Sequence, residues 1–463
     1  MAGWRCLWHP TVVELAQLPE LEERLGDISL AQSYGRVSAV EGLVIRVAGL
    51  NNVAGQATMG ARCKILDIRG EPQGRMAEVV GSTDDGSTLL MPYGALDGIG
   101  PGQRVYMDGA HGGATVRVNH SWIGRVLNGL GEPLDGKGPL ASVGGEDRAL
   151  RAGPPPAFQR NLVGPKMDTG VRVLNTLLPL CEGQRMGIFA GSGVGKSVLM
   201  GMLTRHSNAE VTVIGLIGER GKELNEFIQE ELGAAGLARS VVITATGDEP
   251  PLVRRQAAYL TMAVAEYFRD CGFKVLLLMD SVTRLAQAQR EIGLASREPP
   301  TTRGYTPSVF AELPRLLERA GPGTGTGCIS AIFTVLVEGS DMEEPVADAV
   351  RGILDGHIVL TRSLAERGHF PAIDVLRSVS RMVPKCLSAE EYALVRRTRQ
   401  TLATYDDMAE LIRLGAYTAG SDPQVDEAIR LMPKLETFLR QAPNEGCSMA
   451  DSFARLDDAL KAA

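Results

Sequence analysis

The chain has 463 residues, more than a single hydrophobic core usually serves, so we expect two or three domains. Hydrophobic residues make up 44% of it and charged residues 22%, which is typical of a soluble globular protein. The 48 lysines and arginines face 55 aspartates and glutamates, and the resulting net charge of −7 argues against a global electrostatic affinity for nucleic acid.

Residues 1–30 contain an apolar series at helical spacing, interrupted by Pro19 and accompanied by glutamates. The pattern predicts a short amphipathic segment. It could be a docking arm for a partner or a terminal helix packed on its own domain, and the sequence leaves both readings open. The apolar series is Val12, Leu15, Leu18, Leu21 and Leu25.

Short alternating segments separated by turns follow over residues 31–120. Ala61, Cys63 and Ile65 alternate with basic residues. Leu43, Ile45 and Val47 are expected to share one face. Strands at this turn spacing predict a small closed β-barrel. Residues 121–160 are rich in glycine and proline and end in a Gly153–Pro156 run, which predicts a connector to the next domain.

Residues 161–384 repeat a strand, loop and helix pattern. It predicts an α/β fold, with a parallel sheet covered by helices on both faces. Ligands of such sheets bind at the carboxyl ends of the strands. The apolar runs that predict strands are 186–190, 211–217, 241–245, 275–279 and 329–335.

Past Pro384 the strand pattern stops, and residues 385–463 predict a C-terminal helical domain. Ser388 with Glu391 forms a capping-box signature, and Gly415 marks a break. Asp422-Pro423 is expected to begin another helix, which ends at the Leu431–Pro433 run.

A phosphate-binding loop follows the first apolar run of the sheet. The loop glycines let backbone N–H groups converge on an anion at the start of the next helix. Ala190 replaces the first glycine of the usual motif, which we treat as a tolerated variant, because the phosphate-contacting residues come later. A chance glycine-rich turn is the alternative. The nucleotide-binding candidates are Gly191, Ser192, Gly193, Val194, Gly195, Lys196, Ser197 and Val198.

Three of the predicted strand ends carry the chemistry of phosphoryl transfer. Lys196 is expected to reach the β- and γ-phosphates, and the Ser197 hydroxyl to ligate Mg²⁺. Asp280 ends a buried strand about 85 residues later, where a carboxylate holds the Mg²⁺ shell, commonly through water. Glu219 ends another strand, and we predict that it orients the attacking water or accepts its proton. Its neighbour Arg220 either neutralises phosphate charge or forms a surface ion pair, for example with Glu223.

The seven cysteines are scattered, odd in number and never arranged as C-x-x-C, so we expect reduced thiols in a cytosolic protein. No apolar run of about 18 residues occurs, and charges stand where a signal peptide needs its apolar region. The sequence therefore predicts neither a membrane span nor secretion.

Several blocks together resemble the hexameric ATPases of type III protein export, relatives of the catalytic subunit of F-type ATP synthase. The resemblance covers roughly residues 30–435. The flagellum-specific export ATPase is the most similar in overall appearance, and the virulence-injectisome paralogue shares most of the motifs. The blocks are Gly191–Ser197, Gly218–Gly221, Leu276–Ser281, Tyr305–Gly321, Ile353–Leu360 and Ser378–Arg381, with Leu411–Tyr417 and Gly420–Pro423 for the flagellar group.

This resemblance implies a RecA-like ATPase core that uses ATP and Mg²⁺. It implies that Arg381 is an arginine finger acting on the nucleotide of the adjacent subunit. Phe370 matches an aromatic residue that packs against adenine, although a core phenylalanine fits the sequence equally well. The implied partners are a stator-like regulator at the N-terminal segment, a stalk-like protein at the ring centre, an export gate at the membrane and chaperone–cargo complexes. Nucleic acid is not expected, and the implied location is the cytoplasm, peripherally at the inner-membrane export apparatus.

The single chain carries both Glu219 and Arg381. In the ATP synthase head, one subunit type supplies the catalytic glutamate and another supplies the arginine finger. We therefore predict a homo-oligomeric ring, six-fold by resemblance, with active sites between subunits.

Three other functions fit the sequence less well than protein export. The acidic balance and only 5% aromatic residues disfavour a ring-forming nucleic-acid motor. A rotary synthase subunit would need complementary catalytic and non-catalytic chains, which Glu219 and Arg381 in one chain make unnecessary. A non-catalytic nucleotide-binding scaffold is disfavoured because no expected catalytic group is missing. Flagellum and injectisome stay open alternatives, and the cargo is not encoded in any motif.

Overall fold

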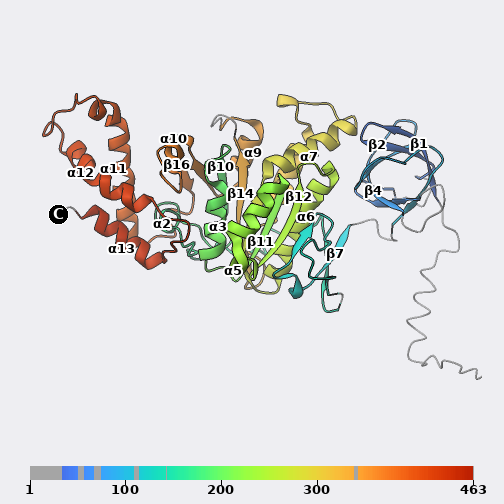
Figure 1. Cartoon of the computed structure of the whole chain (residues 1–463), viewed down its shortest axis with the longest axis horizontal. Coiled ribbons are helices and arrows are strands. Elements are labelled where there is room, and N and C mark those ends of the chain that lie inside the picture. Colours follow the sequence, from blue (N-terminus) through green and yellow to red (C-terminus); the bar gives the residue numbers. More distant parts are fainter. Residues whose placement is uncertain are drawn as a thin grey trace, which may run out of the picture.

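The computed structural model describes residues 34–50, 57–66, 74–108, 114–141, 143–337 and 342–461. The predicted amphipathic segment over residues 1–30 lies outside these ranges. The described chain forms three parts in a row: a barrel, a central sheet with its helices, and a group of C-terminal helices (Figure 1).

The N-terminal part is a closed barrel with strand order β1-β2-β5-β4-β3-β6, as the alternating pattern predicts. Cys63 and Ile65 of β3 point inward and are buried, while Arg62 and Lys64 are half-buried. The prediction for Leu43 is wrong: it lies in the turn before β2 and is exposed, whereas Ile45 and Val47 are buried. The strands are β1 (Gly35–Glu41), β2 (Val44–Ala48), β3 (Arg62–Ile65), β4 (Arg75–Ser82), β5 (Thr88–Pro92) and β6 (Arg104–Met107).

The central part is an eight-stranded sheet with the order β16-β15-β10-β14-β13-β11-β12-β8. All five strands expected from apolar runs are present. The sheet is parallel except at one edge, where β16 runs antiparallel to β15. The strands are β8 (Val126–Asn128), β10 (Arg185–Ala190), β11 (Val211–Glu219), β12 (Ser240–Thr246), β13 (Lys274–Asp280), β14 (Cys328–Leu336), β15 (Gly356–Leu360) and β16 (Ile373–Ser380).

Alternate residues of each central strand pack on opposite faces of the sheet, and both faces are covered. Leu277 and Met279 of β13 pack with one set of helices, α6 to α9. Leu276 and Leu278 pack with the other set, which includes α2 and α3. Strands buried on both faces need continuous apolar runs, which explains why these runs identified them. The α-helices are α2 (Arg172–Thr176), α3 (Lys196–His206), α4 (Gly221–Glu226), α5 (Gly233–Leu237), α6 (Pro251–Asp270), α7 (Val282–Ala295), α8 (Pro307–Leu317), α9 (Pro345–Ile353) and α10 (Arg362–Glu366). Two short 3-10 helices, η2 (His120–Trp122) and η4 (Thr302–Gly304), and one π-helix, η3 (Phe227–Leu232), accompany them.

The segment predicted as a connector, residues 121–160, contributes to the sheet. Its strand β8 pairs in parallel with β12 at the far edge. A second short strand, β9 (Glu146–Ala149), pairs with β7 (Thr115–Val118) in a separate two-stranded ladder. This segment therefore includes regular structure that its turn-rich composition does not indicate.

The C-terminal part contains the helices α11 (Ala389–Arg413), α12 (Pro423–Leu439) and α13 (Met449–Leu460). Ser388 and Glu391 form the predicted capping box, and α11 ends just before Gly415. The predicted end of α12 at Pro433 is wrong, because the helix continues through this proline to Leu439. Leu431 and Leu435 are fully buried on either side of Pro433, and their packing outweighs the lost backbone hydrogen bond.

Among the described helices, none combines the length and apolar character that crossing a membrane requires.

Candidate active site

The predicted phosphate loop lies where β10 ends and α3 begins. Gly193 and Gly195 have φ angles of 74° and 91°, which side chains other than glycine rarely allow. Gly195 directly precedes α3, and among the described residues no side chain caps this helix. The first N–H groups of α3 and its positive dipole end therefore favour an anion at the loop.

Three charged side chains meet beside this loop, each from a different element. Lys196 opens α3, Glu219 ends β11 and Asp280 ends β13. The Lys196 Nζ atom lies 2.5 Å from Asp280 Oδ1 and 3.3 Å from Glu219 Oε1. The parallel register of β11 and β13 explains the meeting, since it brings their carboxyl ends to one edge of the sheet.

Burial and the neighbouring charges together set the proton affinities of Glu219 and Lys196. Burial and the nearby Asp280 carboxylate raise the pKa of Glu219 to about 7, although Lys196 opposes the shift. Burial lowers the pKa of Lys196, but Asp280 and Glu219 outweigh it and hold that pKa above its ordinary value. A carboxyl group with a pKa near neutrality is suited to accept a proton at physiological pH.

The remaining predicted loop residues lie together around the start of α3. Val194 is buried and anchors the loop in the core, whereas the Ser197 side chain in the first turn is exposed. The structure therefore brings the whole predicted loop to one place. The other members are Gly191, Ser192 and the half-buried Val198.

Phe370 lies against the phosphate loop and not in the core. A Cβ atom placed on Gly195 would stand 3.5 Å from the Phe370 ring. The side chain is 43% exposed. An exposed aromatic ring at this position can stack on a planar base.

Arg220 lies outside the cluster. Its side chain is 86% exposed and forms an ion pair with Glu223 at 3.6 Å. This arrangement is the surface ion pair that the sequence left open. A catalytic role for Arg220 stays a prediction, since its ion pair among the described residues is with Glu223 and not with the cluster.

Arg381 is separated from the phosphate loop of its own chain by the length of the sheet's strands. Ile373, at the start of β16, pairs with Leu360 at the carboxyl end of β15. Ser380, at the end of β16, pairs with Gly356 at the opposite end. Arg381 follows Ser380 and therefore lies at the edge where the parallel strands begin, while the phosphate loop lies where they end.

Thr334 is a site residue that the sequence did not single out. Its hydroxyl in β14 donates a 2.6 Å hydrogen bond to Asp280 Oδ1 and is fully buried. A single threonine within an apolar run gives no motif. Only the alignment of β14 beside β13 reveals its contact.

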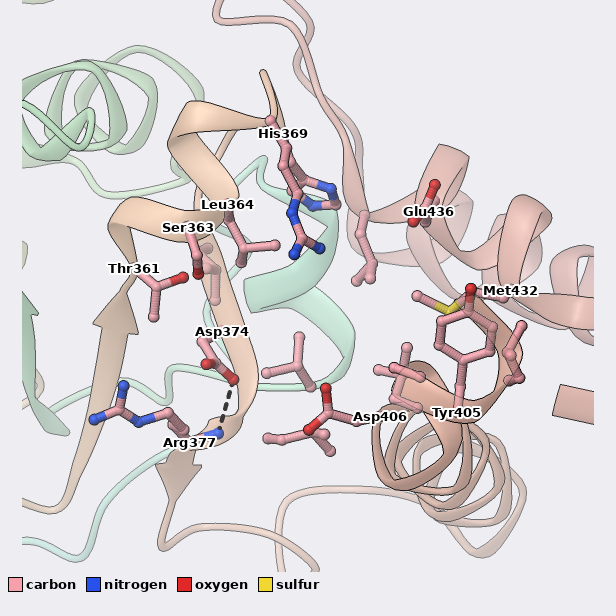
Figure 2. Close-up of a pocket in the computed structure, with 18 of the residues that line it drawn as sticks. Thr361, Ser363, Leu364, His369, Asp374, Arg377, Tyr405, Asp406, Met432 and Glu436 are labelled. Atoms are coloured by element: carbon pink, nitrogen blue, oxygen red, sulfur yellow. Dashed lines mark hydrogen bonds between the residues drawn. The ribbon is translucent and has the colours of Figure 1, made fainter. Parts of the chain in front are cut away.

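A groove of about 860 Å³ lies between the edge of the sheet and the C-terminal helices (Figure 2). One wall comes from α10 and β16, and the other from α11 and α12. None of the charged residues of the phosphate-loop cluster lines it. Residues that face each other across it include Leu364, Asp374 and Arg377 on one side and Tyr405, Ala409, Met432 and Glu436 on the other.

The geometry fits a nucleoside triphosphate with its Mg²⁺ ion. The glycine cradle and the Lys196 ammonium supply donors and positive charge for phosphate. Mg²⁺ takes only one or two protein ligands beside phosphate oxygens and water. The exposed Ser197 hydroxyl and the Asp280 carboxylate suffice in number and chemistry.

Comparison with known proteins agrees with a nucleotide-binding site at the phosphate loop. A family profile described as "ATP synthase alpha/beta family, nucleotide-binding domain" matches residues 170–380. A second profile, "T3SS EscN ATPase C-terminal domain", matches residues 387–458. A flagellum-specific ATP synthase from Caulobacter vibrioides is 52% identical over 446 residues, 95% of this chain and 98% of that protein. A type 3 secretion system ATPase from Xanthomonas euvesicatoria is 47% identical, over 92% of this chain and 93% of that protein.

Solved structures give the same result for the fold. The assembled ATPase EscN of the enteropathogenic E. coli type III secretion system has a TM-score of 0.85 and 40% identity. The match covers 92% of this chain and all of that chain. EscN in complex with its central stalk EscO gives a TM-score of 0.83.

The sheet, the phosphate loop and the charged cluster define a P-loop ATPase with a RecA-like core of the ATP synthase alpha/beta type. Sequence identity near 50% over almost the full length narrows the class from P-loop ATPases in general to one family. The chain belongs to the family of flagellum-specific and type III secretion ATPases.

Proposed function

We propose that this ATPase hydrolyses ATP with Mg²⁺ to energise type III export of flagellar proteins, as a homohexameric ring with active sites between subunits. The meeting of Lys196, Glu219 and Asp280 at the phosphate loop supports the hydrolytic step. The flagellum-specific relatives favour the flagellar system.

Each member of the cluster has a distinct part in hydrolysis. Lys196 exchanges its contacts with Asp280 and Glu219 for the β- and γ-phosphates, and the loop N–H groups hold the same anion. Glu219 orients the attacking water and accepts its proton, in line with its raised pKa. Bound Mg²⁺ supplies positive charge against the phosphates, and Ser197 and Asp280 are the residues that hold it. Phe370 positions the adenine ring beside the loop.

The observation that carries the ring assembly is the position of Arg381. Within one chain, Arg381 lies where the parallel strands begin, and Lys196 lies where they end, at the opposite ends of the same sheet. A rigid sheet cannot bring these two groups onto one phosphate. Arg381 therefore stabilises the transition-state charge on the nucleotide of a neighbouring copy, as arginine fingers do in other phosphoryl-transfer enzymes.

Mixing two inactive variants tests this shared site. Glu219→Gln and Arg381→Ala subunits are each expected to be nearly inactive alone. In equimolar mixed rings, about a quarter of the interfaces pair an intact Glu219 with an intact Arg381, so activity should recover to about that fraction. Absence of recovery in rings proven to contain both variants would contradict a shared site. Rings mixed from Glu219→Gln and Glu219→Ala subunits are the control, since they contain no intact site.

Family membership supports a wider assembly around the ring. EscN was solved with a central stalk, which supports a stalk-like protein at the centre of this ring. A regulator at the N-terminal segment, an export gate and chaperone–cargo complexes complete the proposed partners. The ring then works in the cytoplasm, at the cytoplasmic face of the inner-membrane export apparatus.

A second candidate is the ATPase of a virulence injectisome, which the 47% identity to the Xanthomonas protein favours. Deletion of the gene separates the two systems. Loss of flagellar filaments with normal effector secretion supports the flagellar function, and the reverse phenotype supports the injectisome.

A further inference from the structure

The segment between β9 and α2 carries two large apolar side chains in full contact with solvent. Phe158 is 105% exposed and Leu162 is 93% exposed. We call them the apolar pair. Single exposed apolar side chains are common on protein surfaces, so exposure alone is weak evidence for a binding surface. A fixed backbone and a shared edge with Arg381 distinguish this pair.

The backbone around the apolar pair is held in place. Arg160, between its two members, donates from Nε to the carbonyl of Pro155 at 2.7 Å and from Nη1 to the carbonyl of Glu318 at 3.2 Å. The side-chain amide of Asn161 donates to the carbonyl of Gly325 at 2.7 Å. The apolar pair therefore projects from an ordered platform, which keeps the entropy cost of docking low.

A chain of polar contacts connects this platform to Arg381. Arg160 pairs with Glu318 at 3.4 Å, and Glu318 pairs with Arg185 at 2.6 Å. Arg185 in turn pairs with Asp355 at 3.1 Å, and the Arg381 N–H donates to the Asp355 carbonyl at 2.9 Å. Arg185 opens β10, which is two strands from β16, or about 10 Å. The apolar pair and Arg381 thus occupy the same edge of the sheet, where its parallel strands begin.

A third exposed apolar side chain lies at this end of the sheet, where the parallel strands begin. Val379 is 43% exposed on β16, two residues before Arg381. A standard interface covers about 800 Å² of each partner, which is large enough to include the platform and the end of β16.

We propose that Phe158 and Leu162 anchor the edge that carries Arg381 onto the nucleotide-binding face of a second copy of this chain. This inference rests on the proposed function, because a neighbour's phosphate must come to Arg381. The neighbour that receives Arg381 covers this edge and removes the apolar pair from water. The pair is then a positioning surface that sets how often the shared site is assembled.

The double variant Phe158→Ser with Leu162→Ser tests the proposal in the full-length chain. The protein concentration at half-assembly, measured by mass photometry with Mg²⁺ and a non-hydrolysable ATP analogue, should rise at least tenfold. Specific ATPase activity should fall in the dilute protein and return to the wild-type level at high concentration. Leu162→Ser alone should give a smaller shift in the same direction.

Leu414→Ser is the matched control, because Leu414 is 77% exposed at the end of α11, away from this edge. It should leave the midpoint of assembly unchanged. An unchanged midpoint in the double variant, with a thermal unfolding profile like that of the wild type, would overturn the anchor. So would activity that is lost and does not return with concentration.

Two measurements keep this inference separate from the proposed function. Binding of a fluorescent ATP analogue by the double variant should match the wild type, because the phosphate loop is untouched. A wild-type ring that assembles but does not hydrolyse ATP would overturn the proposed function, while the assembly midpoints would still decide the anchor.

Discussion

At the scale of single residues, Thr334 shows how a buried hydroxyl can join the charged cluster of Lys196, Glu219 and Asp280. Its hydrogen bond fixes the Asp280 oxygen that also contacts Lys196. Without this donor, the buried Asp280 carboxylate loses one of its hydrogen-bond partners, and bulk water does not replace it at this depth.

Replacing Thr334 by valine keeps the shape of the side chain and removes the hydroxyl. We expect kcat to fall about tenfold and stability to fall by about 1 kcal/mol, because a buried charged acceptor loses a donor. Steady-state ATPase assays and thermal unfolding check both effects. Thr334→Ser retains the hydroxyl and should keep most of the activity; a loss as large as that of Thr334→Val would show that packing matters, and not the hydrogen bond.

Phe370→Ala tests the aromatic contact beside Gly195. Since Phe370 is 43% exposed and lies outside the core, its removal should change stability only slightly. The KM for ATP should rise about tenfold, equivalent to ~1.4 kcal/mol of base stacking, with a smaller effect on kcat. Phe370→Tyr keeps the ring and serves as the control. Equal KM values for the alanine variant and the wild type would remove Phe370 from adenine binding.

At the scale of elements, one carboxylate connects β8 to the loop that follows it, while backbone pairing with β12 holds β8 in the sheet. Asp135 accepts from Arg125 Nε at 2.7 Å and from the Val126 backbone N–H at 3.1 Å. The Arg125 guanidinium holds the pKa of Asp135 well below its usual range. A depressed folded-state pKa means that the pairing stabilises the protein above the ordinary pKa of aspartate and is lost as the pH falls through the depressed value.

Asp135→Asn should therefore loosen β8 at neutral pH. Amide hydrogen exchange of Val126–Asn128 is expected to accelerate roughly tenfold, as about 1.5 kcal/mol of charge-assisted hydrogen bonding is lost. In strong acid, the difference between variant and wild type should narrow, because the wild-type carboxyl group becomes protonated. Asp84→Asn, in an exposed turn of the barrel, controls for the change in net charge. A difference that does not depend on pH would contradict the ion pair as its cause.

At the scale of the whole molecule, the groove of Figure 2 separates the ATPase core from the C-terminal helices. The sheet edge and α11 can change their angle only if this space changes shape. Coupling of hydrolysis to export through the C-terminal helices would use this freedom.

Ala409→Trp fills the groove from α11 and should restrict such movement. We expect kcat to fall several-fold while binding of the fluorescent ATP analogue stays unchanged, since the phosphate loop lies elsewhere. Ala393→Trp, on an exposed part of the same helix, is the matched control. Unchanged turnover in a correctly folded Ala409→Trp variant would show that the groove does not close during catalysis.

The sequence by itself determined the central strands, the phosphate loop and the capping box of α11. These features are local, because a run of buried residues, a glycine cradle or a cap leaves its pattern within a few consecutive residues. The roles of Glu219 and Asp280 came from their place at strand ends, and their meeting with Lys196 agrees with that reasoning.

Tertiary structure alone decided the rest. Thr334 joins the site through a neighbouring strand, β8 enters the sheet from a turn-rich segment, and α12 continues through Pro433 because its flanking leucines are buried. Arg381 is separated from its own phosphate loop because β16 runs against the other strands. Strand order and direction depend on contacts between residues far apart in the chain, which leave no local pattern.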